Sequence, residues 1–190
     1  MYISTFLLPL ALLPGALSLG PVPTIPSNHS SLPLVPYTYP PLEQIRYTLS
    51  LETFLLDAKD WSALNLVYTH DAVANFTSLG AGVWTGRDQI IANEQKALGA
   101  VTHGIHQISS SAILISPGKF DEARVTSYYT FNHFTVANGS QHVFQAWFKY
   151  QDQWINTRSY DGSPSSWRVK DRQVELIGGP VGADLKVERP

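Results

Sequence analysis

The order of two hydrophobic patterns limits most strongly what this chain can fold into. Apolar residues recur at helical spacing over residues 42–58, and shorter helical signals follow at 61–68 and 86–98. Helices followed by a β meander predict an α+β domain, because a parallel sheet needs strands and helices in alternation. The predicted strands cover a short run at 72–77 and long runs at roughly 104–115, 123–136, 141–157 and 166–177.

Local sequence signals mark the boundaries of these elements. Asp60 is a suitable N-cap for the second helix. Thr85 to Asp88 resembles a capping box with Asp in place of Glu, and it opens the third helix. Turn clusters at 116–119, 137–140 and 160–164 separate the long strands. We therefore expect helices packed on one face of a curved sheet, with a single cavity between the layers.

The N-terminal region has a composition unlike the rest. Residues 1–18 carry no charged side chain, and their apolar run is too short to span a membrane. Ala16-Leu-Ser18 is a small-x-small cleavage site, so residues 1–18 predict a signal peptide and a secreted protein without a membrane anchor. The alternative is a buried N-terminal segment.

Nine of the 13 prolines lie in the first 41 residues, so the composition of residues 19–41 predicts an extended linker. The domain is expected at 42–178, with a tail at 179–190.

Three N-glycosylation sequons agree with secretion. They begin at Asn28, Asn75 and Asn138. Asn138 lies in a predicted turn, where a glycan fits, whereas Asn75 lies inside a predicted strand. We expect these three positions as glycosylation candidates, with Asn75 the least accessible of them.

Composition excludes several classes of function. The chain has no cysteine, which excludes disulfides, zinc fingers and thiol nucleophiles. With 13 Lys and Arg against 15 Asp and Glu, and no basic run longer than two residues, the charge footprint of a nucleic-acid binder is missing. Histidine and carboxylate side chains are left as the candidate catalytic groups.

The predicted strand at 141–157 has two distinct faces. Even positions carry most of its aromatic side chains and predict the core face, and Asp152 lies on it. A carboxylate on an aromatic face is either paired or has a raised pKa, and both situations occur at catalytic sites. Alternatively the inward-facing run ends before Asp152, which then lies in solvent.

Histidines supply the other candidate acid–base groups. His133 shares the odd, apolar face of the strand at 123–136 and so points to the same interior, as a structural or a catalytic residue. His103 and His106 are three apart, but residues at that spacing in a strand point to opposite faces. We therefore expect no metal site and, without a glycine-rich phosphate loop, no cofactor. Asp57, at the end of the first helix, either points into the cavity mouth or ends the helix in water.

Seven short segments follow one another in a recognisable order. They are Asp57-Ala-Lys-Asp-Trp61, Asp71-Ala-Val73, Gly86-Arg-Asp-Gln-Ile90, Thr102-His-Gly-Ile-His106, Ala123-Arg-Val-Thr-Ser-Tyr128, Tyr150-Gln-Asp152 and Trp167-Arg-Val-Lys-Asp-Arg172. Together they resemble the SnoaL-like branch of the NTF2-like superfamily. The resemblance implies a cone fold, with three N-terminal helices packed on a strongly curved antiparallel sheet that encloses a pocket.

Within this branch, the segment at 57–61 is locally similar to scytalone dehydratase, a lyase of fungal polyketide metabolism. That resemblance implies that Asp57 holds His106, which acts as general acid and base. His133 is then the nearest match to the family's second histidine, and His133 or Asp152 is the candidate second acid. The residues expected to bind substrate are Tyr68, Phe76, Tyr129, Phe148, Tyr150 and Trp154.

The chain also departs from the scytalone dehydratase pattern. Leu56 and Phe76 stand where that family has tyrosines that polarise the substrate carbonyl through water. Phe148 replaces a glycine and would narrow one end of the pocket. These departures argue against scytalone itself as the substrate.

The resemblance leaves three kinds of function open. The first is a cofactor-independent lyase, isomerase or cyclase of secondary metabolism, acting on a small aromatic or polyketide-type molecule. The second is a secreted protein that binds a small hydrophobic molecule without chemistry. The third is a dimerisation module, because curved sheets of this superfamily often pair by their outer faces.

Overall fold

The structure is a computed structural model that describes residues 39–137, 140–157 and 166–182. The predicted signal peptide at 1–18, Asn28, Asn138 and residues 183–190 lie outside the described residues, as does most of the predicted linker. Within the described residues, no helix is long and apolar enough to cross a membrane.

The two α-helices precede the long strands, as the hydrophobic pattern predicts. Helix α1 spans Pro41–Ala58 and begins with a proline in its first turn, where the missing N–H costs no hydrogen bond. Helix α2 spans Arg87–Leu98. The second predicted helix differs, because Trp61–Leu66 forms a short 3-10 helix, η2, and the chain enters a strand at Tyr68. Another short 3-10 turn, η3, covers Thr77–Leu79.

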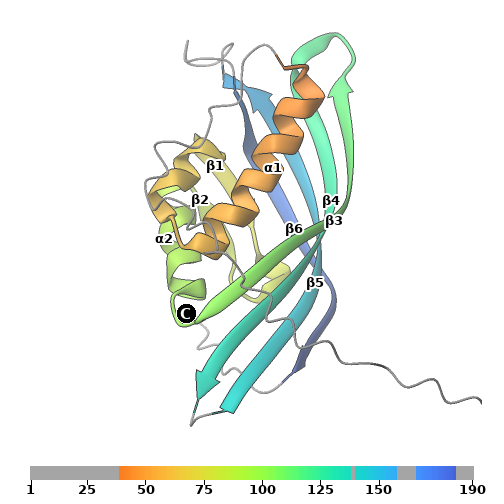
Figure 1. The fold of residues 1–190 in the computed structure, drawn as a ribbon. Helices are drawn as coiled ribbons and strands as arrows, with labels where there is room; N and C mark the ends of the chain where they lie inside the picture. The colour runs from red at the N-terminus through yellow and green to blue at the C-terminus, as the bar shows by residue number, and fades with distance from the viewer. Residues whose placement is uncertain (1–38, 138–139, 158–165, 183–190) are drawn as a thin grey trace, which may run out of the picture. The chain divides into compact units, whose positions relative to one another are not determined.

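Six strands form one sheet in the order β2-β1-β6-β5-β4-β3 (Figure 1). The fold class is therefore α+β, as predicted. One pairing differs from the antiparallel expectation, since β1 runs parallel to β6. This pairing joins one of the first strands to the last, so no local turn signal could predict it. The strands are β1 Tyr68–Asn75, β2 Val83–Thr85, β3 His103–Ser116, β4 Lys119–Ala137, β5 Ser140–Asn156 and β6 Trp167–Gly182.

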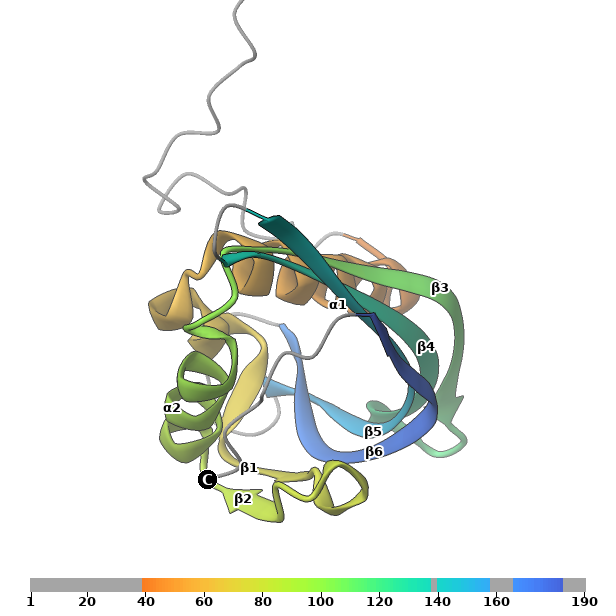
Figure 2. The same cartoon turned by 90° about the horizontal axis from the view of Figure 1, so that it is seen from below.

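The sheet curls strongly, and both α-helices lie on its concave side (Figure 2). The alternation predicted for β4 and β5 is present: Tyr129, Phe148 and Trp154 are buried on the concave face. Helix α1 contributes Ile45, Leu49 and Leu55 to the same core, among other side chains. Burying these apolar side chains against the sheet stabilises the domain, at about 1.5–3 kcal/mol for each large one.

Candidate functional site

The end of α1 fixes the position of the first predicted catalytic residue. Lys59 adopts a left-handed conformation with φ 57°, which terminates the helix one residue after Ala58. Its backbone N–H donates to the Leu56 carbonyl at 3.1 Å, and that of Asp60 donates to the Leu55 carbonyl at 2.9 Å. These bonds satisfy carbonyls that the helix end would otherwise leave without partners. Asp57 therefore lies in the last turn of a well-terminated helix.

The side chain of Lys59 ties this helix end to the start of β3. Its Nζ donates to the carbonyl of Gly99 at 3.4 Å and to the carbonyl of Val101. Both carbonyls lie just before β3, the strand that carries His106. The tether holds the last turn of α1 beside the first residues of the strand.

Asp57 and His106 form a close hydrogen-bonded pair. Asp57 Oδ1 lies 2.5 Å from His106 Nδ1, and the backbone N–H of His106 donates to both Asp57 oxygens, at 3.1 and 3.2 Å. Because a carboxylate accepts hydrogen bonds, we assign the Nδ1 proton to the imidazole, which leaves Nε2 with its lone pair. The His106 side chain is 2% exposed and that of Asp57 is 24% exposed. Of the two orientations open for Asp57, the structure has the one that faces the histidine.

His133 completes the group that we call the dyad cluster: Asp57, His106 and His133. The centroids of the two imidazole rings are 5.4 Å apart. Both Nε2 atoms are buried and have no hydrogen-bond partner among the described residues. Buried polar atoms are nearly always paired, so two such atoms on neighbouring rings indicate a place where a ligand or water binds.

The electrostatics of His133 favour its neutral form. Burial, together with the nearby His106, lowers the pKa of His133 to about 4, although Asp57 acts in the opposite direction. His133 is therefore neutral at physiological pH, and its ring can accept or donate a hydrogen bond without carrying a charge.

A row of aromatic rings extends from the dyad cluster along the concave face. Phe131 packs edge-on against His106 with centroids 4.3 Å apart, and Phe148 lies 4.5 Å from Phe131. Tyr129 and Tyr150 stack at 4.3 Å. Three of the predicted substrate-binding residues are thus in one row with Phe131. Phe131 lies on the same face of β4 as Tyr129, but it is not among the predicted binding residues.

A second buried polar group lies further along the same face. We call it the arginine cluster: Glu52, Tyr68, Tyr129, Asp152 and Arg172. Arg172 makes five hydrogen bonds, two with Asp152 at 2.8 and 3.0 Å, two with Glu52 at 2.5 and 3.1 Å, and one with Tyr68 at 2.8 Å. Five is also the number of N–H groups on a guanidinium. Tyr68 and Tyr129 each donate to Glu52.

The pKa values in this cluster follow from burial opposed by Arg172. Burial raises the pKa of Asp152 despite the adjacent guanidinium. Burial would also raise that of Glu52, but the charge and hydrogen bonds of Arg172, with the two tyrosine hydroxyls, lower it overall. Glu94, half-buried on α2, has its pKa raised to about 7, by burial first and by the charge of Glu52 second.

The structure does not bring all the predicted site residues together. Asp152 is buried, as its strand face indicates, but both its oxygens accept from Arg172. Tyr68 belongs to the arginine cluster, and Phe76 stacks on Trp84 with centroids 4.2 Å apart. Trp154 is wholly buried in the core. Asn75 ends β1 and accepts from the Thr77 N–H at 2.9 Å, and its glycosylation stays a prediction.

Sequence reasoning missed Glu52 and Arg172. Glu52 could have been found, because it lies three residues after Leu49 on the apolar stripe of α1. Arg172 is harder, because the pairing of β5 with β6 shifts between Gln153 and Trp154. This irregularity changes the phase of β6, so strict alternation from Trp167 predicts an outward Arg172.

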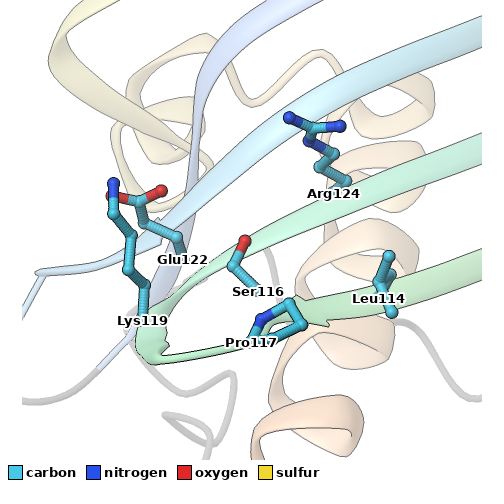
Figure 3. A pocket seen from close by; sticks show the side chains of 6 residues that line it. All are labelled: Leu114, Ser116, Pro117, Lys119, Glu122 and Arg124. Carbon is cyan, nitrogen blue, oxygen red and sulfur yellow. The ribbon is translucent and has the colours of Figure 1, made fainter.

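A surface hollow lies elsewhere, at the turn between β3 and β4 (Figure 3). Its charged side chains include Lys119, which pairs with Glu122 at 2.9 Å. It includes no predicted site residue and none of the buried polar groups described above. Its lining residues are Leu114, Ser116, Pro117, Lys119, Glu122 and Arg124. Among the described residues, no three His, Asp or Glu side chains are grouped as metal ligands would be.

With the site described, comparison with known proteins identifies the family. The model of the SnoaL-like domain matches residues 41–173. The chain belongs to the SnoaL-like family. No curated protein matches the SnoaL-like chain significantly in sequence.

Solved structures with the same fold share little sequence with this SnoaL-like protein. A proposed scytalone dehydratase from Novosphingobium aromaticivorans has a TM-score of 0.61 at 18% identity, over 78% of this chain and 91% of that one. A hexachlorocyclohexane dehydrochlorinase from Novosphingobium barchaimii has a TM-score of 0.60 at 12% identity, over 78% and 94%. ActVI-ORFA from Streptomyces coelicolor has 0.58 at 13%, over 72% and 96%. An NTF2-like protein from Novosphingobium aromaticivorans has a TM-score of 0.55 at 18% identity, over 74% of this chain and 84% of that one, so the fold is NTF2-like.

Proposed function

We propose that this protein is a cofactor-independent lyase that eliminates water from a small aromatic or polyketide-type molecule. The observation that carries the proposal is the Asp57–His106 hydrogen bond together with the buried, unpartnered Nε2 of His106. This arrangement is that of a general base whose second nitrogen is held by a carboxylate.

The chemistry assigns each side chain a role. Nε2 of His106 takes the proton from the carbon next to a carbonyl group, and Asp57 stabilises the imidazolium that forms. The bond from the neighbouring carbon to its hydroxyl then breaks, and the hydroxyl leaves as water with the proton that His106 returns. A positioned acid–base group of this kind accelerates a reaction by about 10²–10⁴-fold.

His133 fits the role of a second polar group better than Asp152 does. His133 is neutral and lies beside His106, so it can orient the leaving hydroxyl by a hydrogen bond. Both oxygens of Asp152 accept hydrogen bonds from Arg172, so we assign Asp152 a structural role in the sheet. The aromatic row from Phe131 to Tyr150 would stack on a flat substrate.

Two of the structurally similar proteins are named for elimination reactions, a scytalone dehydratase and a dehydrochlorinase. Their identity to this chain is 18% and 12%, so they support the reaction class as a proposal and give no substrate. Isomerisation and cyclisation use the same proton abstraction and are the neighbouring alternatives within this class.

Secretion and dimerisation are further parts of the proposal. Secretion rests on residues 1–18, and sequencing the N-terminus of the protein from culture medium tests it.

The homodimer would form through the convex face, where exposed apolar side chains include Ile105, Tyr128, Val143 and Ile177. Sedimentation of an Ile177→Asp variant against the unchanged protein tests it.

The elimination is tested with 3-hydroxy-1-tetralone, a bicyclic β-hydroxyketone that becomes fluorescent 1-naphthol when it loses water. We expect turnover to fall by about 10²–10⁴-fold in H106A and D57N, since both remove the base or its orientation. H103A, an exposed histidine on the same strand, serves as the control and should keep its rate. Equal rates in H106A and the unchanged protein would contradict the proposal. If the unchanged protein binds 3-hydroxy-1-tetralone but does not turn it over, the non-catalytic binding function is favoured.

A further inference from the structure

Gly104 occupies an unusual place in β3. It lies two residues before His106, and it is paired in register with His133 across the β3–β4 ladder. Glycine inside a strand weakens the strand, because it costs backbone entropy and packs no side chain. A glycine at such a position usually has a structural reason.

The backbone supplies no such reason here. Gly104 is not among the glycines with positive φ, so an ordinary residue can adopt its conformation. A Cβ built on it would meet no atom closer than 3.5 Å, which is ordinary van der Waals contact. Gly182 is different, because its φ is 120° and a Cβ there would collide with the Val143 carbonyl.

The atoms around the missing side chain belong to the dyad cluster. The Cβ would lie 3.5 Å from Asp57 Oδ1, 3.6 Å from His106 Cε1 and 3.7 Å from His133 Cδ2. Each of these two ring carbons is bonded to the Nε2 of its own imidazole. The position of the missing Cβ therefore lies beside the ring edges that carry both unpartnered nitrogens.

We propose that Gly104 is a specificity-determining residue, which keeps open the space through which the reacting edge of the substrate reaches the two imidazoles. The inference rests on the proposed function for the identity of the reacting groups. It adds a substrate limit: the reacting edge must be narrow and unbranched, such as the CH2–CHOH edge of a cyclic β-hydroxyketone. A branched substituent next to the reacting carbon would meet the wall that Gly104 forms.

The test measures access to the imidazoles without requiring turnover. Diethylpyrocarbonate acylates neutral imidazole nitrogens, so at pH 7 the rate at His133 reports access to its Nε2 rather than its protonation. Peptide mass spectrometry follows His133 and His106, with the exposed His103 as the internal reference in every sample. The variants are G104A and G104V, and the control is G178A. Gly178 is a strand glycine without positive φ whose nearest neighbour is Trp147, at 3.4 Å.

We expect acylation of His133 to slow at least fivefold in G104V and less in G104A, while His103 and the G178A control keep their rates. Melting temperatures of G104A and G178A should equal or exceed that of the unchanged protein, since alanine restricts the unfolded chain. Equal His133 rates in folded G104A, G104V and unchanged protein would overturn the proposal. Absence of any His133 acylation in the unchanged protein while His103 reacts would also overturn it, because no open path would then exist.

Turnover separates this inference from the proposed function. If 3-hydroxy-1-tetralone is a substrate, G104V should lower its kcat/KM at least tenfold. In G104A, kcat/KM should fall more for a tetralone that carries a methyl group beside the reacting carbon than for the parent tetralone. If no elimination occurs but G104V protects His133, the proposed reaction fails and the access role of Gly104 stands. Elimination at an unchanged rate in folded G104V would sink the access role alone.

Discussion

The concave side of the sheet holds two buried polar clusters that differ in how completely their hydrogen bonds are used. In the arginine cluster, the five N–H groups of Arg172 meet acceptors on Glu52, Asp152 and Tyr68. In the dyad cluster, Asp57 fixes one side of His106, while the Nε2 atoms of His106 and His133 have no partner among the described residues. A completed network holds the fold together, whereas an incomplete one leaves hydrogen-bonding capacity for a ligand.

Removing the arginine should give the largest effect on stability. In R172M, Glu52 and Asp152 lose their cation in a site where both are almost inaccessible to water. We expect the free energy of unfolding to fall by about 3–5 kcal/mol, as when one partner of a buried ion pair is removed. Urea unfolding measures it, and R124M, at an exposed arginine, should change little. A loss below 1 kcal/mol in R172M would contradict the structural role of the arginine cluster.

His133, in the dyad cluster, should affect the pH dependence of stability. The folded pKa of His133, about 4, lies below the ordinary histidine pKa of 6.5, so the unfolded chain takes up this proton first as the pH falls. The contribution of His133 is complete above pH 6.5 and is lost between pH 6.5 and 4, by about 3 kcal/mol at most. H133F removes this titration, so its unfolding free energy should fall less over this range than that of the unchanged protein. H103A, measured alongside, should keep the original slope, and identical slopes for H133F and H103A would refute the assignment.

The smallest effect is expected at Lys59, whose side chain tethers the end of α1 to the start of β3. K59M removes the hydrogen bonds to the carbonyls of Gly99 and Val101, at a cost of about 1 kcal/mol. Because the tether positions Asp57, turnover of 3-hydroxy-1-tetralone should fall, but less than in D57N. Urea unfolding and the fluorescence assay measure the two effects, with K96M on the exposed side of α2 as control. A K59M variant as active as K96M would show that Asp57 is positioned without the tether.

The two clusters also differ in how far the sequence predicts them. Period-two alternation places His133 and Asp152 on the inward faces of β4 and β5, and the structure has them there. The contact of Asp57 with His106 joins residues 49 positions apart and follows from the family resemblance, not from any local pattern. The partner of Asp152 lies beyond such reasoning, because the irregular pairing of β5 with β6 reverses the expected face of Arg172.

The fold itself was largely predictable where the signals are local. Helix α1 and the long strands follow from hydrophobic periodicity, and the predicted turn at 116–119 lies between β3 and β4. The 3-10 helix at Trp61–Leu66 and the parallel pairing of β1 with β6 did not follow. Both depend on tertiary packing, which overrides the short helical signal and joins distant segments.

The central claim, that the incomplete cluster binds the ligand and the complete one does not, is tested most directly by ¹⁵N NMR of the ring and guanidinium nitrogens. The protein is titrated with 1-naphthol, the product of the proposed elimination. We predict that the Nε2 signals of His106 and His133 shift with saturation while the Nε–H signal of Arg172 stays in place. A saturable shift of Arg172 with unmoved imidazole signals would contradict the account.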